Sequence, residues 1–163
     1  ESDDGTPATD DVPLERAWAN LEAAAERGLA HSLGVCNVSV AQLERILETC
    51  SVPPALVSVE RHPYQPRRAL VERCHEAGIR VVAHAPLSAP GLLDAPVLAA
   101  VGERHGLSPA GVVVAWNVTA GVVPIPSSTA PEHLTANLAA ASTRLDDRAR
   151  ERIGALADPE FER

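Results

Sequence analysis

The fold is decided by residues 55–85, which read ALVSVERHPYQPRRALVERCHEAGIRVVAHA. The run Ala55–Glu60 is short and apolar, as a buried strand would be, and Ile79–Ala85 has the same character. The segment between them starts at Pro66, carries apolar residues at helical spacing and stops at Gly78. A strand, a helix and a strand in this order predict a right-handed βαβ crossover in a parallel sheet.

The same alternation extends in both directions along the chain. Two further strands are expected at 32–36 and 121–125. Helices are expected at about 13–27, 39–50, 96–105, 109–119, 129–141 and 146–156. A complete (β/α)₈ barrel has eight strands and about 250 residues. The predicted fold class is therefore α/β, a partial barrel of about four parallel strands with flanking helices, which is half a barrel.

Three of these helices carry clear N-terminal capping signals. Ser39 with Gln42 has the spacing of a capping box, and Thr129 with Glu132 has the same spacing. Ser108 precedes a proline, which is favoured in the first helical turn. These signals predict where the helices begin.

Composition limits the class of partner and the compartment. The net charge of -8 argues against nucleic acid and anionic membranes, which need a positive surface. Cys36, Cys50 and Cys74 match no disulfide or zinc pattern, and neither a membrane span nor a signal peptide is visible, so a cytoplasmic location is expected. Residues 1–11 are expected to form an acidic flexible tail, and residues 12–163 a single domain.

Polar side chains gather where the predicted strands end. In parallel α/β folds these ends share one face, which is where active sites lie. Cys36 is either a thiolate nucleophile or a small buried side chain, and Asn37 binds an amide or only turns the chain. His84 is either an acid–base group or a satisfied core histidine. Glu60 forms, with the two residues after it, either a functional cluster or a structural salt bridge.

The turn after the fourth strand has two interpretations. Ser127, Ser128 and Thr129 offer hydroxyls and free amides at a helix N-terminus, which suits an anion such as phosphate. The same residues would equally serve as an ordinary helix cap. No metal site is expected from the sequence.

Five phrases in this order resemble the later half of the aldo-keto reductases. They are LGVCN at 33–37, ERHPY at 60–64, VAHAPL at 82–87, LSPA at 107–110 and VPIPSS at 123–128. The resemblance runs from about Val12 to Leu156 and implies strands five to eight of a (β/α)₈ barrel. It also implies a family that reduces carbonyls with NADPH, in which a Tyr donates the proton with help from Lys, Asp and His. Those four groups precede the matched region in the family, and this chain has a single Tyr, Tyr64, and no Lys.

The resemblance also assigns cofactor-binding positions, several of them altered. On the nicotinamide side it places the family's Ser-Asn pair at Cys36 and Asn37, its Gln at Ser58 and its stacking Tyr at His84. On the phosphate and adenosine side the positions are Leu87, Ser127, Ser128, His133 and Asn137. Ser127 and His133 replace basic residues, which weakens the binding of phosphate because charge-assisted hydrogen bonds are lost. The resemblance therefore implies NADPH as a possible cofactor, bound through contacts that are weakened at several of these positions.

Three functions remain open from the sequence. The first is a repurposed non-redox enzyme, an isomerase, cyclase, dehydratase or lyase acting on a small carbonyl-containing metabolite, with His84, Cys36 and Glu60 as acid–base or nucleophilic groups. The second is an NADPH-dependent carbonyl reductase whose Tyr, Lys, Asp and His come from a missing segment or a partner chain. The third is a non-catalytic binding module. Open sheet edges favour pairing, so a homodimer or a partner chain that completes the barrel is expected, in addition to a small-molecule substrate.

Overall fold

The structure is a computed structural model that describes residues 12–162. Helices and strands alternate as predicted: α1 (Leu14–Glu26), β1 (Gly34–Cys36), α2 (Val40–Thr49), β2 (Leu56–Glu60), α3 (Arg68–Glu76), β3 (Arg80–His84), η1 (Leu92–Asp94), α4 (Pro96–His105), α5 (Pro109–Thr119), β4 (Val123–Pro124), α6 (Pro131–Ala140), α7 (Asp147–Gly154) and η2 (Pro159–Glu162). The acidic tail predicted for residues 1–11 lies outside the described residues.

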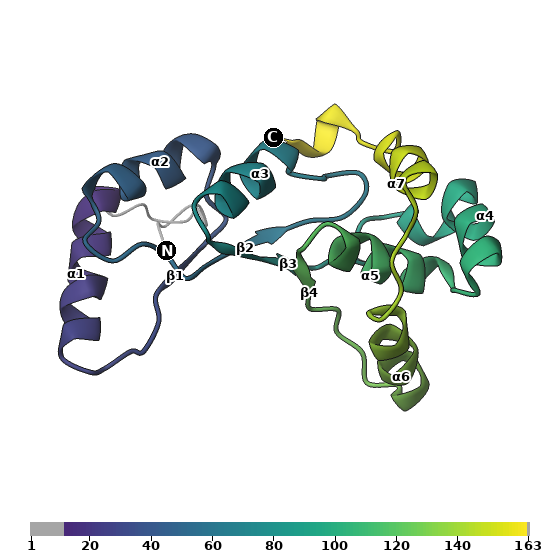
Figure 1. Cartoon of the computed structure of the whole chain (residues 1–163), viewed down its shortest axis with the longest axis horizontal. Helices are drawn as coiled ribbons and strands as arrows, with labels where there is room; N and C mark the ends of the chain where they lie inside the picture. Colours follow the sequence, from purple (N-terminus) through teal and green to yellow (C-terminus); the bar gives the residue numbers. More distant parts are fainter. Residues whose placement is uncertain (1–11, 163) are drawn as a thin grey trace, which may run out of the picture.

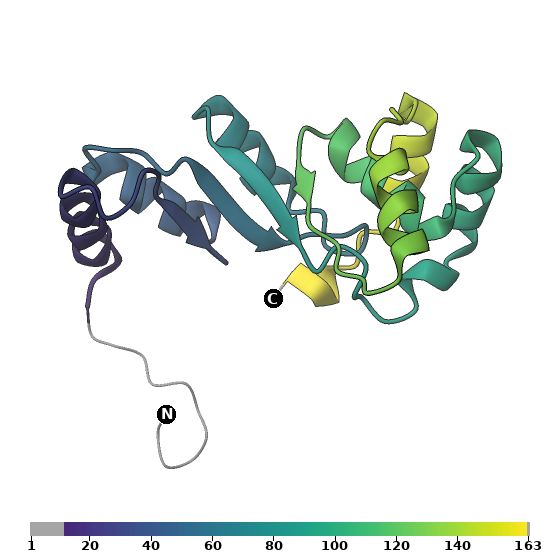
Figure 2. The ribbon, with the colours of Figure 1, turned by 90° about the horizontal axis from the view of Figure 1, so that it is seen from below.

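The four strands form one parallel sheet in the order β1-β2-β3-β4, which confirms the predicted fold class. The register aligns Cys36 with Ser58 and Glu60 with His84 on neighbouring strands. Figure 1 and Figure 2 show an elongated molecule, with α1 and α2 at one end, α4 to α7 at the other, and the sheet between them. Every consecutive strand pair is joined through at least one helix, as βαβ crossovers require.

The two faces of the sheet differ in burial. Val57, Val59, Val81 and Ala83 are buried, and they belong to a core cluster that includes residues of α2 and α3. The alternate residues of β2 and β3 are exposed or half-buried. Because successive side chains of a strand point to opposite faces, the helices cover one side of the sheet. We call the other side, which carries Cys36, Leu56, Ser58, Glu60, Arg80, Val82, His84 and Val123, the open face.

The helix caps confirm two of the three signals. Ser39 accepts a hydrogen bond from the Gln42 amide, and the Gln42 side chain accepts one from the Ser39 amide. Ser108 caps α5 by accepting from Gly111. The predicted Thr129 cap is wrong: α6 has Ala130 as its N-cap residue and no side-chain cap, because Ser128 Oγ instead accepts from the Ala130 amide in a turn before the helix.

Several predicted boundaries also change, and two of these changes have a clear physical cause. The helix expected from Pro66 begins at Arg68, because Arg67 has a left-handed conformation with φ 48°. The strand expected over 121–125 shrinks to Val123–Pro124. Proline has no amide hydrogen to donate, so Pro124 and Pro126 interrupt the donor pattern that a longer strand would need. None of the helices within residues 12–162 has both the length and the apolar character needed to cross a membrane.

Candidate functional site

Asn37 and His84 meet at the carboxyl end of the sheet. His84 Nε2 lies 2.9 Å from Asn37 Oδ1, although the residues are 47 positions apart in the sequence. The Asn37 amide donates to the Ser58 carbonyl at 2.8 Å, which ties the turn after β1 to β2. Asn37 has φ 54°, in the left-handed region that asparagine tolerates better than most residues. The turn chemistry thus brings together a nicotinamide-side pair that the sequence had predicted from separate phrases.

Cys36, Ser58 and Glu60 share the open face with His84. Cys36 is aligned with Ser58, and Glu60 with His84, so the four side chains occupy two adjacent rows of the sheet. Cys36 is exposed and the other three are half-buried. The three predicted catalytic residues therefore lie on one surface that a small molecule can reach, although no hydrogen bond joins Cys36 to His84 in the described part of the chain.

In the predicted cluster after β2, Glu60 and His62 form a pair, whereas Arg61 lies apart from them. Glu60 Oε1 lies 3.3 Å from Nε2 of His62, whose side chain is fully buried. The Gln65 amide donates to His62 Nδ1, so Nε2 carries the proton that faces Glu60. Burial lowers the pKa of His62, with the Glu60 hydrogen bond acting in the opposite direction. Arg61 takes no part in this pair and points into the helical layer.

A cavity of about 550 Å³ lies between η1, α5, α6 and the loop after β4. Its lining includes all the predicted phosphate-side and adenosine-side residues: Leu87, Ser127, Ser128, His133 and Asn137. Ser128 Oγ lies 3.4 Å from His133 Nδ1 across this cavity wall. Five positions assigned from separate phrases thus converge on one space large enough for part of a dinucleotide.

The lining of this cavity is poor in positive charge. It contains no Arg or Lys side chain among the described residues, and Glu132 adds a carboxylate. Ser127 and His133 stand where the resemblance implies basic groups. The cavity therefore suits the adenosine part of a nucleotide better than a densely charged phosphate group.

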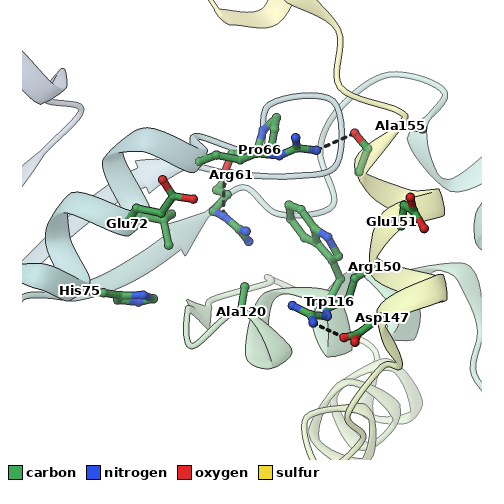
Figure 3. A pocket seen from close by; sticks show the side chains of 13 residues that line it. Arg61, Pro66, Glu72, His75, Trp116, Ala120, Asp147, Arg150, Glu151 and Ala155 are labelled. Carbon is green, nitrogen blue, oxygen red and sulfur yellow. Dashed lines mark hydrogen bonds and ion pairs between the residues drawn. The ribbon is translucent and has the colours of Figure 1, made fainter.

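A second cavity, which the sequence did not predict, lies on the helix-covered side of the sheet. It has a volume of about 700 Å³ and is bounded by α3, α5 and α7. Figure 3 shows the Arg61 guanidinium pointing into it beside the Trp116 ring. The only sequence signals were an arginine in the strand-end phrase and Trp116-Asn117 within an otherwise apolar helix. Elsewhere in residues 12–162, no group of three or more His, Cys, Asp and Glu side chains is arranged to hold a metal ion.

The chain matches the model of a known protein family. The model of the "Aldo/keto reductase family" matches residues 6–158. The chain is 36% identical over 148 residues to "Aldo-keto reductase family 1 member A1" of Cricetulus griseus. The aligned region covers 85% of this chain and 46% of that protein. It is 36% identical to "Aldo/keto reductase slr0942" of Synechocystis sp., over 93% of this chain and 49% of that protein. The chain therefore spans about half the length of the curated relatives it matches.

Solved structures give the same result. An aldose reductase from Schistosoma japonicum superposes with a TM-score of 0.89 at 28% identity, over 98% of this chain and 53% of that one. A mutant of Gox0644 in complex with NADPH superposes with a TM-score of 0.81 at 29% identity, over 90% of this chain and 54% of that one. The four-stranded sheet and its helices therefore correspond to about half of a larger known fold.

Proposed function

Because this chain belongs to the aldo/keto reductase family, we propose that it forms the cofactor-binding half of an NADPH-dependent carbonyl reductase. The proton-donating Tyr and its Lys, Asp and His partners come from a second half of the barrel, which is either another segment or a partner chain. The relatives quoted above are named reductases, which favours this function over the non-redox acid–base chemistry expected from the altered strand ends.

The observation that carries the proposal is the cavity lined by Leu87, Ser127, Ser128, His133 and Asn137. These residues match the family's phosphate-side and adenosine-side positions, and nothing else in the sequence required them to share one space. Asn137 and Ser128 offer an amide and a hydroxyl to the adenosine. The absence of Arg and Lys from the described lining implies weak contact with the 2′-phosphate.

The nicotinamide end of the site belongs to the open face. The cofactor, when bound, supplies the hydride. His84 would provide a flat ring for the nicotinamide, and Asn37 would provide an amide for the carboxamide group. These two side chains hydrogen-bond each other at 2.9 Å, so Asn37 Oδ1 would have to leave His84 in order to accept a hydrogen bond from the ligand. Ser58 and Cys36, adjacent in register, border the same surface but have shorter or weaker hydrogen-bonding groups than the family's Gln and Ser.

The proposal is tested by titrating the chain with NADPH and measuring cofactor fluorescence, alone and after mixing with the first half of a homologous reductase that carries the Tyr, Lys, Asp and His. We expect measurable binding to the chain alone and carbonyl reduction only in the mixture. Asn137→Ala should weaken binding, since it removes an amide from the cavity. Thr135→Ala on exposed α6 surface is the matched control, because Thr135 does not line the cavity.

Two results would overturn the proposal. One is an absence of NADPH binding both alone and in the mixture, with the chain folded. The other is binding that Asn137→Ala leaves unchanged, since the cofactor would then occupy a different place. A mixture in which the Tyr of the added half is replaced by Phe should bind NADPH but not reduce the carbonyl.

A further inference from the structure

Arg61 is a cation buried on the opposite side of the sheet from the proposed cofactor site. Its side chain is held in place by three contacts: Nε donates to the Pro66 carbonyl at 3.0 Å, Nη1 donates to Asn117 Oδ1 at 2.5 Å, and the guanidinium lies 3.9 Å from the Trp116 ring centre. The residue is only 4% exposed. The position of the charge is therefore fixed by the fold.

No carboxylate among the side chains that the structure describes forms an ion pair with Arg61. Its hydrogen bonds to Pro66 and Asn117 use two of its five N–H groups, and both acceptors are neutral. Burial, together with the nearby charge of Arg68, lowers the pKa of Arg61 to about 9, so it stays charged at neutral pH. A buried charge without a counterion is costly in a folded protein, and a bound anion would offset that cost.

The cavity beside Arg61 is large enough to hold such an anion. Its volume is about 700 Å³, and Figure 3 shows the guanidinium directed into it from the residue that follows β2, with α3 on one side and α7 on the other. Of the other two arginines of the lining, Arg150 pairs with Asp147 and Arg68 donates one hydrogen bond to the Gly154 carbonyl, and both are exposed to solvent. Arg61 is thus the buried cation of this lining, with N–H groups left over and no carboxylate partner.

We propose that this cavity is a binding site for a small planar carboxylate, held by the free N–H edge of Arg61 at its floor. The rim selects the class of anion, because Glu72 and Glu151 also line the cavity and repel multiply charged groups. A monoanionic carboxylate meets less repulsion than a phosphate dianion, and its two oxygens match the flat guanidinium. The apolar part of the ligand would lie along Val71 and Trp116.

The test uses benzoate as the probe and the two tryptophan indole N–H signals in a proton–nitrogen NMR spectrum as the readout. Trp116 borders the cavity, whereas the Trp18 indole donates to the Val52 carbonyl in a different core cluster. We expect benzoate to shift the Trp116 signal along a saturable curve and to leave Trp18 in place. Arg61→Met should weaken this binding by about tenfold or more, the scale of a lost charge-assisted bond.

Matched probes and variants keep the test decisive. Arg148→Gln removes an exposed charge of α7 that does not line the cavity, so benzoate affinity should change little. A Trp116 signal that does not move with benzoate would overturn the proposal, and so would an equal response to neutral benzamide, which would indicate simple apolar binding. Tighter binding of inorganic phosphate than of benzoate would refute the carboxylate class. If Arg61→Met fails to fold, Arg61→Lys is the second variant. It keeps the positive charge but loses the planar guanidinium that can donate two parallel hydrogen bonds, so it should bind benzoate more weakly than the wild type.

Discussion

His62 is a titratable side chain with no exposure to solvent. Its Nδ1 accepts from the Gln65 amide, and its ring contacts the edges of Tyr64 and Phe161. Burial lowers the pKa of His62 below that of the unfolded chain. As the pH falls below about 6.5, the unfolded chain takes up a proton that the folded chain resists. The folded state therefore loses stability in this range, and above it the group has no effect.

Replacing His62 should change how strongly the free energy of unfolding depends on pH. In His62→Asn, the acceptor for the Gln65 amide is kept while the titrating group is removed. Urea unfolding between pH 7 and pH 5 should show a shallower loss of the free energy of unfolding in this variant than in the wild type. His31→Asn, at an exposed position, is the control and should leave the slope unchanged. Equal slopes in wild type and His62→Asn would show that His62 does not couple protonation to folding.

Ser127 offers a gain-of-function test of the proposed cofactor site. The cavity that it lines has no Arg or Lys among the described residues, so under the proposed function the 2′-phosphate that distinguishes NADPH from NADH would have no strong partner. In Ser127→Lys, a charge-assisted bond to that phosphate should strengthen NADPH binding by about tenfold. NADH affinity, measured in the same fluorescence titration, should stay the same.

The control for this change places the same charge elsewhere. Ser142 is exposed just beyond the last residue of α6, at the end opposite to Ser127. Ser142→Lys should leave both affinities unchanged. An equal gain for NADH and NADPH in Ser127→Lys would show that the lysine meets the pyrophosphate or a general field, not the 2′-phosphate.

At the scale of helices, the caps of α2 and α6 give opposite expectations from the same sequence pattern. Ser39 makes both hydrogen bonds of a capping box, so Ser39→Ala should lower the free energy of unfolding by about 1 kcal/mol. Thr129 makes no cap of α6, so Thr129→Ala should change it by less than about 0.5 kcal/mol. Denaturant unfolding measures both. A loss of comparable size in Thr129→Ala would mean that Thr129 caps α6 in solution.

The order of strands and helices could be predicted because it depends on local apolar runs and turn residues. Gly78 does adopt positive φ at the helix end where it was expected. The start of α3 could not be predicted, because it depends on contacts that only the fold provides. His62 and Gln65 pair across a tight turn, and the Pro66 carbonyl accepts from Arg61, so helical geometry is delayed to Arg68.

The candidate site, like the fold, could be predicted from the sequence only in part. The predicted residues at the strand ends converge because parallel strands end on one side, so Asn37 and His84 could be placed together from sequence. The Arg61 cavity could not. It depends on Arg61 and Asn117, 56 residues apart, and on a groove between helices whose packing no local pattern encodes.

At the scale of the whole molecule, the open face leaves large apolar side chains exposed to solvent. Leu56 is 37% exposed and Val123 is 41% exposed on this side, and Ile125, just after β4, is 53% exposed. The sheet also ends in two edge strands, β1 and β4, without a neighbour among the described residues. In the family's complete barrel the sheet closes on itself and side chains fill the interior. We therefore expect a second half-barrel, either another copy of this chain or the half that carries the missing catalytic groups, to cover this face.

Light scattering on the chain by itself separates these arrangements. A mass of two chains is expected if copies cover each other, since about 25 cal/mol is gained for each Å² of apolar surface removed from water. Ile125→Glu should then shift the mass toward one chain without unfolding it, because the side chain is already half in solvent. Leu29→Glu, at a position 68% exposed in the turn after α1, adds the same charge at a residue that is not part of the open face and should leave the mass unchanged. A monodisperse single chain would exclude the homodimer, and the open face would then be left for a different half-barrel. That half should form a complex with the wild-type chain and a weaker one with Ile125→Glu.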